Sequence, residues 1–465
     1  MGRIPLDEFS GELLEPGDAG YDDARTLWNS MIDKRPALIA RCRSPKDVVA
    51  ALALARNEGL EVAVRGGGHS VSGLSCTDGG VMIDLRSMNA VVVDPESRRV
   101  RVGGGALLRE LDRVTHENGL ATTGGMVHHT GVAGLTLGGG FGWLGRLHGL
   151  ACDNLASATV VTAGGDIVTA SDGENADLFW GIQGGGGNFG IVTEFEFRLH
   201  PIGPMLSVEL RFGAEDAPAG LRAYRELMGS APPELCSLVG VEAGRGAGRL
   251  EDAGSDAGGL YLWYVYAGAD LEEGERLGAS LRSVARPIAE QVDVLSYPDL
   301  QSATGEGSGP GRRHYWKGSL MWELSDAFLD AFLERGLMAE GGCGIELFSL
   351  GAAISSVGED DTAYPNRDAA FDLLPAATWD DPEDDERNIS LTRKNWEALS
   401  PFARSGAYVN DLGVDADERV REVYGSTKLE RLAALKDRWD PDNTFHLNAN
   451  SAPRRGSGPE RGRPG

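Results

Sequence analysis

The sequence lacks long apolar runs, a basic surface and a cysteine framework. No stretch of about 18 apolar residues is present to cross a bilayer as a helix. Lys and Arg total 44 against 70 Asp and Glu, and the formal charge of −26 excludes partners that require a basic surface, such as nucleic acids and anionic membranes. The five cysteines are odd in number and far apart, which is typical of a reducing cytoplasm. The acidic N-terminal stretch has no apolar core, so we expect no secretory signal.

Short motifs that identify common enzyme classes are also missing. The chain has no G-x-x-x-x-G-K-[ST], which excludes a P-loop, and no G-x-S-x-G, which leaves a serine hydrolase unsupported. It has no H-E-x-x-H and no C-x-x-C, and the adjacent His128 and His129 cannot share one face of a strand or helix, so we expect no metal site. Gly140, Gly142 and Gly145 match G-x-G-x-x-G, but the flanking segments disfavour a nicotinamide-binding Rossmann unit.

Glycine, in contrast, is abundant and clustered. The chain has 66 glycines in 465 residues, about twice the usual ~7%, and the runs RGGGH, VGGG, TTGG, GVAGLTLGGGFG and QGGGGNFG all precede residue 191. Glycine loops offer many backbone N–H groups at close range to a diphosphate. We therefore expect the loops Arg65 to Ser70 and Gly131 to Gly142 to clasp a diphosphate, with His69 beside an attached ring system. The alternative for His69 is a loop imidazole bonded to a carbonyl.

Strands, hairpins and helices mix along the chain as an α+β pattern. Residues 36 to 56 predict a strand and then a helix capped by Ser44, and ASATVVTAGGDIVTAS predicts a hairpin about a Gly-Gly turn. After residue 204 the glycine clusters give way to strands of an antiparallel sheet and to amphipathic helices. The predicted parts are a first domain over 1–204 with its core at 36–204, a second over 205–400, a closing segment over 401–451, and a polar tail over 452–465 that we expect to be disordered.

Several of these segments together resemble one family. VRGGGHS, VMIDLRSMNAVVVDPESRRVRVGGGALLRELD, TGVAGLTLGGGFGWLGR and DLFWGIQGGGGNFGIVTEFEFRLHPIGP, followed by YVN and LKDRWDPDNTFHLNAN near the end, resemble the berberine-bridge-enzyme type of FAD-linked oxidases within the vanillyl-alcohol-oxidase superfamily. The resemblance implies a two-part FAD-binding domain of the PCMH type, to which the closing segment returns. It also implies an α+β substrate domain built on an antiparallel sheet.

The resemblance assigns the cofactor site. In this family the histidine after the glycines carries FAD covalently, through an imidazole nitrogen to the 8α-methyl carbon, and His69 occupies that position. Relatives with a second bond use a cysteine where this chain has Val127, so we expect a single linkage. The other FAD contacts implied are Arg65, Gly66, Gly67, Gly68, Ser70, Thr130, Gly131, Gly134, Gly138, Gly139, Gly140, Gly142, Asn154, Gly190, Ile191, Val192, Tyr408, Asn410, Asn448 and Asn450.

Two residues are candidates for handling the substrate proton. Glu346 stands alone among apolar neighbours in CGIELFSLG, and an apolar wall raises the pKa of a carboxyl group. Its alternative is a strand residue that faces solvent. Tyr408, in a predicted YVN strand, is the second candidate, and its alternative is a simply packed ring.

These features predict an FAD-linked oxidase. It would remove hydride from a C–H next to O or N of a small or medium substrate, with O2 as acceptor, and tailor a secondary metabolite in the cytoplasm as a monomer or homodimer. Alternatives are a dehydrogenase, an oxygenase or cyclase of polyketide-like substrates, and a flavin-binding protein without turnover. The middle of the chain has the least motif content, so the sequence does not name the substrate.

Overall fold

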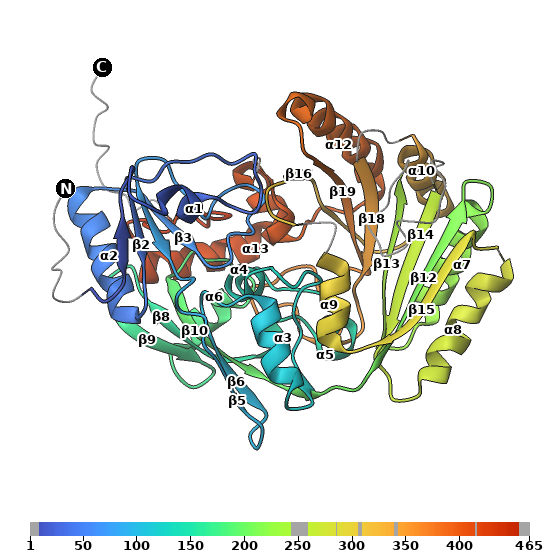
Figure 1. Cartoon of the computed structure of the whole chain (residues 1–465), viewed down its shortest axis with the longest axis horizontal. Helices are drawn as coiled ribbons and strands as arrows, with labels where there is room; N and C mark the ends of the chain where they lie inside the picture. The colour runs from blue at the N-terminus through green and yellow to red at the C-terminus, as the bar shows by residue number, and fades with distance from the viewer. Residues whose placement is uncertain are drawn as a thin grey trace.

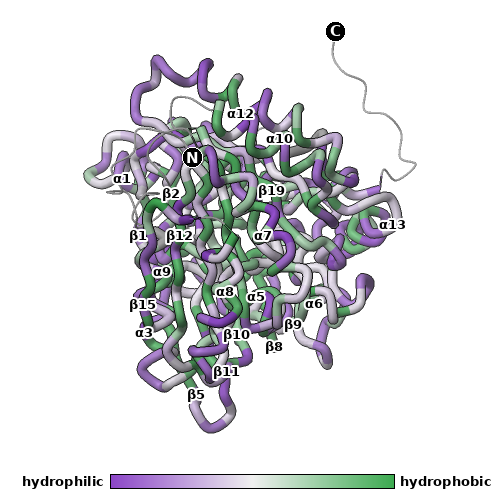
Figure 2. Tube along the Cα trace, turned by 90° about the vertical axis from the view of Figure 1, so that its right-hand side faces the viewer, coloured by the Kyte–Doolittle hydropathy of each residue, from purple (hydrophilic) through white to green (hydrophobic). Residues whose placement is uncertain are grey.

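The computed structural model describes residues 9–242, 259–284, 286–305, 309–338, 343–413 and 416–454. Most of the predicted tail, from residue 455 onward, lies outside these residues. In the described residues, helices and four sheets form two halves that meet along the middle of the molecule (Figure 1). Hydrophobic segments gather in the interior strands, whereas hydrophilic segments follow the outer loops and helix faces (Figure 2). The α+β fold class predicted from the sequence is confirmed.

The first sheet begins the glycine-rich half and has the order β1-β2-β4-β3. Its strands are β1 (Glu12–Leu14), β2 (Leu38–Arg41), β4 (Val81–Asp84) and β3 (Val62–Arg65), and β4 runs parallel to both β2 and β3. The connecting helix α2 (Pro45–Glu58) starts as predicted, because Ser44 Oγ accepts a hydrogen bond from the Asp47 N–H. Strand β3 ends at the predicted glycine loop and so fixes where that loop begins.

The second sheet is antiparallel and has the order β5-β6-β10-β8-β9. It comprises β5 (Val91–Asp94), β6 (Arg99–Gly103), β10 (Ile191–Arg198), β8 (Leu155–Val161) and β9 (Ile167–Ser171), and the predicted Gly-Gly turn joins the last two. Its core also takes side chains from α6 (Ala176–Ile182) and from the C-terminal α13 (Ala416–Trp439). The closing segment therefore packs on the first half of the chain.

Short elements connect these sheets. They are α1 (Tyr21–Arg25), α3 (Leu108–His116), α4 (Val132–Leu137), α5 (Gly145–His148), the 3-10 turn η1 (Cys152–Asn154) and the two-stranded pair β7 (Leu120–Ala121) and β11 (His200–Pro201). Helix α4 starts inside the second glycine loop, directly after Gly131. Gly131 lies against Gly67 of the first loop.

The second half is built on an eight-stranded antiparallel sheet of order β15-β12-β14-β13-β18-β19-β16, with β17 pairing β19. The strands are β12 (Met205–Gly213), β13 (Leu235–Glu242), β14 (Gly259–Tyr266), β15 (Ala289–Leu295), β16 (Arg313–Trp316), β17 (Ser319–Met321), β18 (Cys343–Ser349) and β19 (Phe371–Trp379). Helices α7 (Ala217–Ser230), α8 (Leu271–Val284), α10 (Asp326–Leu337) and α12 (Asp385–Leu399) cover its outer face (Figure 1).

The inner face of this sheet meets the glycine-rich half. Trp263 of β14 packs against Trp143, with ring centroids 5.0 Å apart, and Phe348 of β18 stacks on Phe141 at 5.0 Å. Helix α9 (Tyr297–Gly305) packs beside α3 at the same junction. The inner strands β13, β18 and β19 thus face the glycine loops.

One local prediction differs from the structure. Residues Val409–Asp411 form a 3-10 turn, η5, and not a strand, because the Asp411 N–H bonds back to the Tyr408 carbonyl. Strand β18, which carries Glu346, ends at Ser349, and the short helix α11 (Ala353–Ser356) follows it. The remaining short turns are η3 (Pro382–Asp384) and η4 (Ser400–Phe402).

Candidate active site

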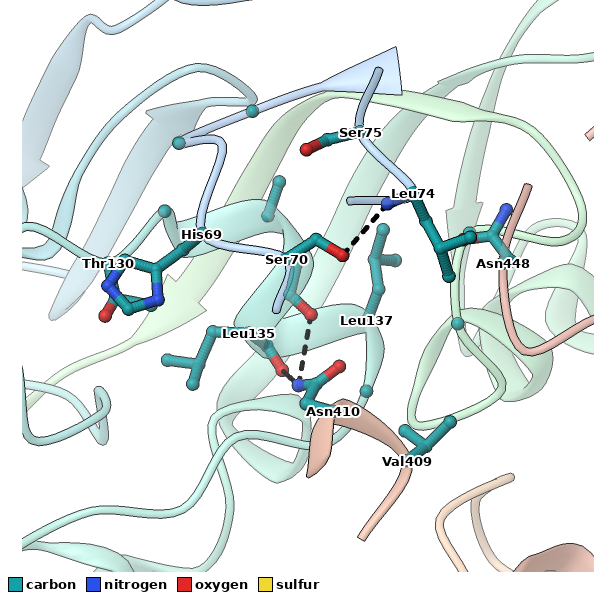
Figure 3. A pocket seen from close by; sticks show the side chains of 18 of the residues that line it. His69, Ser70, Leu74, Ser75, Thr130, Leu135, Leu137, Val409, Asn410 and Asn448 are labelled. Atoms are coloured by element: carbon teal, nitrogen blue, oxygen red, sulfur yellow. Dashed lines mark hydrogen bonds between the residues drawn. The ribbon is translucent and has the colours of Figure 1, made fainter. Parts of the chain in front are cut away.

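One cavity of about 380 Å³ lies between the two halves (Figure 3). Both glycine loops, the start of β10, the inner strands of the large sheet and the C-terminal segment form its wall. The predicted site residues in this wall are Gly66, Gly67, Gly68, His69, Ser70, Thr130, Gly131, Gly134, Gly138, Gly190, Ile191, Val192, Glu346, Tyr408, Asn410 and Asn448. The structure thus brings most of the candidates together from six separate stretches of sequence.

The two glycine loops touch each other through their backbones. A Cβ added to Gly67 would lie 2.5 Å from the Cα of Gly131, and one added to Gly131 would lie 2.5 Å from the N of Gly67. Real Cβ atoms do not approach so closely, so only glycine allows the contact at these positions. The loops consequently form one continuous wall of main chain along the cavity.

Aromatic rings surround His69 at the edge of this wall. Its imidazole stacks on Trp28 with a centroid distance of 4.1 Å, and His314 of β16 stacks on Trp28 at 3.7 Å. His69 Nε2 lies 3.1 Å from His129 Nδ1. Burial, followed by the nearby His129 and His314, lowers the pKa of His69 to about 3. The imidazole is therefore uncharged at neutral pH, which leaves a ring nitrogen lone pair available for bonding.

Arg65 does not line the cavity; its buried side chain packs against the first glycine loop. Its guanidinium donates to the Ala24 carbonyl, and burial lowers its pKa to about 10. Gly68 has φ of 76°, and a Cβ there would lie 2.8 Å from Arg65 Nε. The buried guanidinium thus sets the path of the loop that ends at His69.

The C-terminal segment docks on the second loop through Tyr408 and Asn410. The Tyr408 hydroxyl accepts hydrogen bonds from the Gly140 N–H at 3.0 Å and from Asn410 Nδ2 at 2.7 Å. Asn410 Nδ2 also reaches the carbonyls of Gly134 and Leu135, both at 3.3 Å (Figure 3). Burial raises the pKa of Tyr408 above its ordinary value, so the phenol stays protonated at neutral pH.

Glu346 enters the cavity from β18 with one strong partner. The Tyr261 hydroxyl donates to Glu346 Oε1 at 2.5 Å. This contact crosses Gly240 on the intervening strand β13, where an added Cβ would lie 2.4 Å from the Tyr261 ring. Burial raises the pKa of Glu346, although the Tyr261 bond acts in the opposite direction.

Sequence reasoning missed two carboxyl groups in the same wall. Asp372 of β19 and Asp411 of η5 are 2% and 7% exposed, and both line the cavity. Burial and the neighbouring Asp411 hold the pKa of Asp372 well above its ordinary value, and burial raises the pKa of Asp411 to about 7. The signal that selected Glu346, a single acid in an apolar strand, is present in FDLLPAATW as well.

Six predicted contact residues lie outside the cavity wall: Arg65, Gly139, Gly140, Gly142, Asn154 and Asn450. Asn154 uses its amide locally, because Nδ2 donates to the carbonyls of His148 and Leu150 and Oδ1 contacts His200 Nε2 at 2.7 Å. Gly142 serves packing, since a Cβ there would lie 2.5 Å from the carbonyl oxygens of Gly124 and Gly125.

None of the described helices is long and apolar enough to cross a membrane. No group of three or more His, Cys, Asp or Glu side chains in the described ranges is arranged to hold a metal ion.

Two family models match the chain at segments that form the cavity wall. The model described as FAD binding domain matches residues 36–171, and the model described as berberine and berberine like matches residues 407–450. The first match contains both glycine loops, and the second contains Tyr408, Asn410 and Asn448.

Similar proteins extend over nearly the whole chain. It is 32% identical to (R)-6-hydroxynicotine oxidase of Paenarthrobacter nicotinovorans, with 96% of this chain and 97% of that protein covered. The crystal structure of 6-hydroxy-D-nicotine oxidase from Arthrobacter nicotinovorans matches with a TM-score of 0.85 at 30% identity, over 96% of this chain and 98% of that one. Glucooligosaccharide oxidase from Acremonium strictum, described with a 6-S-cysteinyl, 8α-N1-histidyl FAD, matches with a TM-score of 0.82 at 25% identity, over 96% and 98%.

Proposed function

Because the chain belongs to the berberine-bridge-enzyme-like FAD-linked oxidoreductases, we propose that it is an oxidase whose FAD is bonded to His69 alone. When bound, FAD would supply the acceptor for a hydride from a substrate C–H next to oxygen or nitrogen, and dioxygen would take up the two electrons as hydrogen peroxide. The substrate is a small or medium organic molecule that occupies the cavity on the side of the large sheet.

The cavity wall suits an FAD molecule. The contact between Gly67 and Gly131 leaves main-chain N–H groups unobstructed, as a diphosphate requires. Ser75 and Trp316 line the same cavity, and Ser75 Oγ and Trp316 Nε1 are buried without a hydrogen-bond partner among the described residues. Such orphaned polar atoms are satisfied when a polar ligand binds.

The single observation that carries the covalent linkage is the position of His69, which lines the cavity at the end of the first glycine loop with its imidazole stacked on Trp28. An imidazolium has no lone pair with which to bond to carbon, and burial keeps this ring neutral. Stacking on Trp28 and the contact with His129 hold the ring in one orientation. Val127 lines the cavity where a second, cysteine linkage would form, and a valine side chain has no atom that can make it.

Glu346 is the residue we propose for proton transfer with the substrate. Its raised pKa brings the carboxyl group toward the range in which it exchanges protons near neutral pH. The hydrogen bond from Tyr261 stabilises the ionised form and fixes the carboxylate in the cavity. Tyr408 already accepts two N–H donors, so its own proton is free to bond a substrate heteroatom, and we assign it a positioning and donating role.

We further propose action on a secondary metabolite in the cytoplasm. The five cysteines are all buried and unpaired with one another, which agrees with a reducing compartment. The three carboxyl groups and the apolar side chains on the sheet side give the cavity the mixed character of a small-molecule site.

The linkage is tested by acid precipitation of purified protein. In the wild type the flavin colour should precipitate with the protein, and digestion should give one flavin-bearing peptide that contains His69. His69→Ala should release all flavin to the supernatant, whereas the matched control His128→Ala, in the neighbouring loop, should retain it. A wild-type supernatant that contains all the flavin contradicts the linkage.

The oxidase assignment and the proton-transfer role need separate measurements. Peroxide formation in air separates an oxidase from a dehydrogenase that passes electrons to another acceptor. For Glu346→Gln we expect the anaerobic rate of flavin reduction to fall by about 10²-fold or more, the size typical of a lost acid or base. The exposed Glu323→Gln should match the wild type. An unchanged rate in Glu346→Gln excludes the role.

A further inference from the structure

The carboxyl pair Asp372 and Asp411 has no role in the function proposed above. The two residues come from different parts of the chain, β19 and the turn η5, and meet at the cavity wall with 2% and 7% of their surface exposed. Side chains of this kind are seldom buried without partners, because an unpaired carboxylate loses its hydration. The pair therefore needs an explanation.

The two carboxyl groups share one hydrogen bond with each other. Within the described part of the chain no other group donates to them, and Asp372 Oδ1 and Asp411 Oδ2 are buried without a partner. Arg419 is near enough to lower the pKa of Asp411. Its Nε and Nη2, however, bond to Glu422 and to the Gly318 carbonyl. The pair thus keeps acceptor oxygens that the protein itself leaves unused.

The rest of the cavity wall adds negative charge and no positive charge. Glu346 is the third carboxyl group in it, and no Lys or Arg is among the described residues that line it. His69 is uncharged at neutral pH, because its pKa is about 3. An anionic substrate would be repelled by this charge, whereas a cation would donate hydrogen bonds to Asp372 Oδ1 and Asp411 Oδ2 and balance the charge of the pair.

From the negative charge and the unpartnered oxygens of this cavity wall, we propose that Asp372 and Asp411 bind the ammonium group of the substrate. The substrate is then an amine that enters the cavity as an organic cation. This rests on the proposed oxidase function and names its substrate class. Apolar and aromatic side chains that line the same cavity, including Phe348, Leu374 and Trp316, accommodate the hydrocarbon part, and aromatic faces also attract a cation. The N–H donors of one ammonium group can bond to both carboxylates at once.

The pair titrates as one unit, and this gives the site a pH signature. Asp411 titrates near pH 7, and the pKa of Asp372 is raised further by its neighbour, so the free site gains negative charge as the pH rises through about 7. The charge of Glu346 raises the pKa of Asp372 as well, whereas the charge of Arg419 lowers the pKa of Asp411. The buried phenols Tyr364 and Tyr408 stay protonated and carry no charge. Affinity for a cation should therefore increase from pH 5 to pH 9.

The test uses two probes of the same shape and different charge. The holoenzyme is titrated under argon, by calorimetry, with 4-phenylpiperidine, which is a cation throughout this pH range, and with 4-phenyltetrahydropyran, which is neutral. We expect the piperidine to bind at least tenfold more tightly at pH 8, and this preference to fall at low pH. Asp411→Asn and Asp372→Asn should each reduce the preference at least fivefold, whereas Glu323→Gln, which removes an exposed carboxylate, should not change it.

Each outcome separates this inference from the oxidase proposal. Equal binding of the two probes by the wild type at every pH overturns the inference, and so does a preference that survives in both Asn variants. Because covalent flavin is measured independently by acid precipitation, the linkage to His69 can hold while the amine site fails. If Asp372→Asn does not fold, Asp411→Asn and the wild-type pH series still decide the result.

Discussion

Replacing Lys436 with Met is the sharpest test of how the C-terminal segment is held. Lys436 and Asp440 are both 0% exposed, and Nζ lies 2.7 Å from Asp440 Oδ2. The same ammonium donates to the carbonyls of Asn188 at 2.7 Å and Phe445 at 3.1 Å. Asp440 in turn accepts from the N–H groups of Thr444 and Phe445. One buried cation thus joins α13, the last glycine run and the turn that carries Asn448 to the cavity.

The expected cost follows from the burial of both charges. Lys436→Met leaves Asp440 buried without its counter-ion and two carbonyls without their donor. Removing one partner of a buried ion pair typically costs about 3–5 kcal/mol, a large part of the ~5–15 kcal/mol that stabilises a domain. The double variant Lys436→Met/Asp440→Asn should be more stable than Lys436→Met alone, because no uncompensated charge remains.

Guanidinium unfolding followed by tryptophan fluorescence measures this loss. The matched control is Arg438→Met, since the Arg438–Asp177 pair is 63% and 37% exposed, and such pairs contribute about 0–1 kcal/mol. We also expect Lys436→Met to contain less bound flavin. An unfolding free energy for Lys436→Met within 1 kcal/mol of the wild type would refute the reasoning.

Two further predictions concern the glycine wall and pH. Gly67→Ala should separate the first loop from Gly131 and reduce flavin incorporation at least tenfold by absorbance, while Gly229→Ala, where an added Cβ meets nothing within 4 Å, should incorporate flavin normally. His148 stacks on His200 at 3.9 Å, and burial, then the charge of His200, lowers the pKa of His148 to about 4 from 6.5. Its contribution to stability is complete above pH 6.5 and is lost as the pH falls toward 4, by at most about 3 kcal/mol. Unfolding free energies of His148→Phe should show a shallower loss over that range, and an unchanged slope would contradict the assignment.

Local signals in the sequence predicted local structure well. Ser44 and the Gly-Gly turn act through neighbours within a few residues, so the start of α2 and the β8–β9 hairpin are formed as predicted. The YVN segment, expected as a strand, instead forms the turn η5, closed by the Asp411 N–H bond to the Tyr408 carbonyl. Asn410 then holds this turn against the second glycine loop, through contacts with distant carbonyls that the local sequence does not reveal.

The parts of the candidate site that consist of sequence motifs were predictable. The parts that form only when distant segments pack together were not. The glycine loops and His69 were found because their residue types are unusual and clustered. Trp28 lies outside every motif, and only the folded chain brings it against His69. Asp372 carried the same signal as Glu346, an acid within an apolar strand. Its pairing with Asp411 depends on a turn that the sequence did not reveal.

The column formed by His314, Trp28 and His69 has a consequence for how the protein matures. Trp28 is made early and the glycine loop soon after, but His314 lies at position 314 of 465, in the second half of the molecule. The stack of Trp28 with both His314 and the ring that we propose as the attachment point of the cofactor is therefore complete only after most of the chain has left the ribosome. We expect flavin attachment to be a late event that reports on the folding of both halves, so that yellow colour marks a correctly assembled molecule.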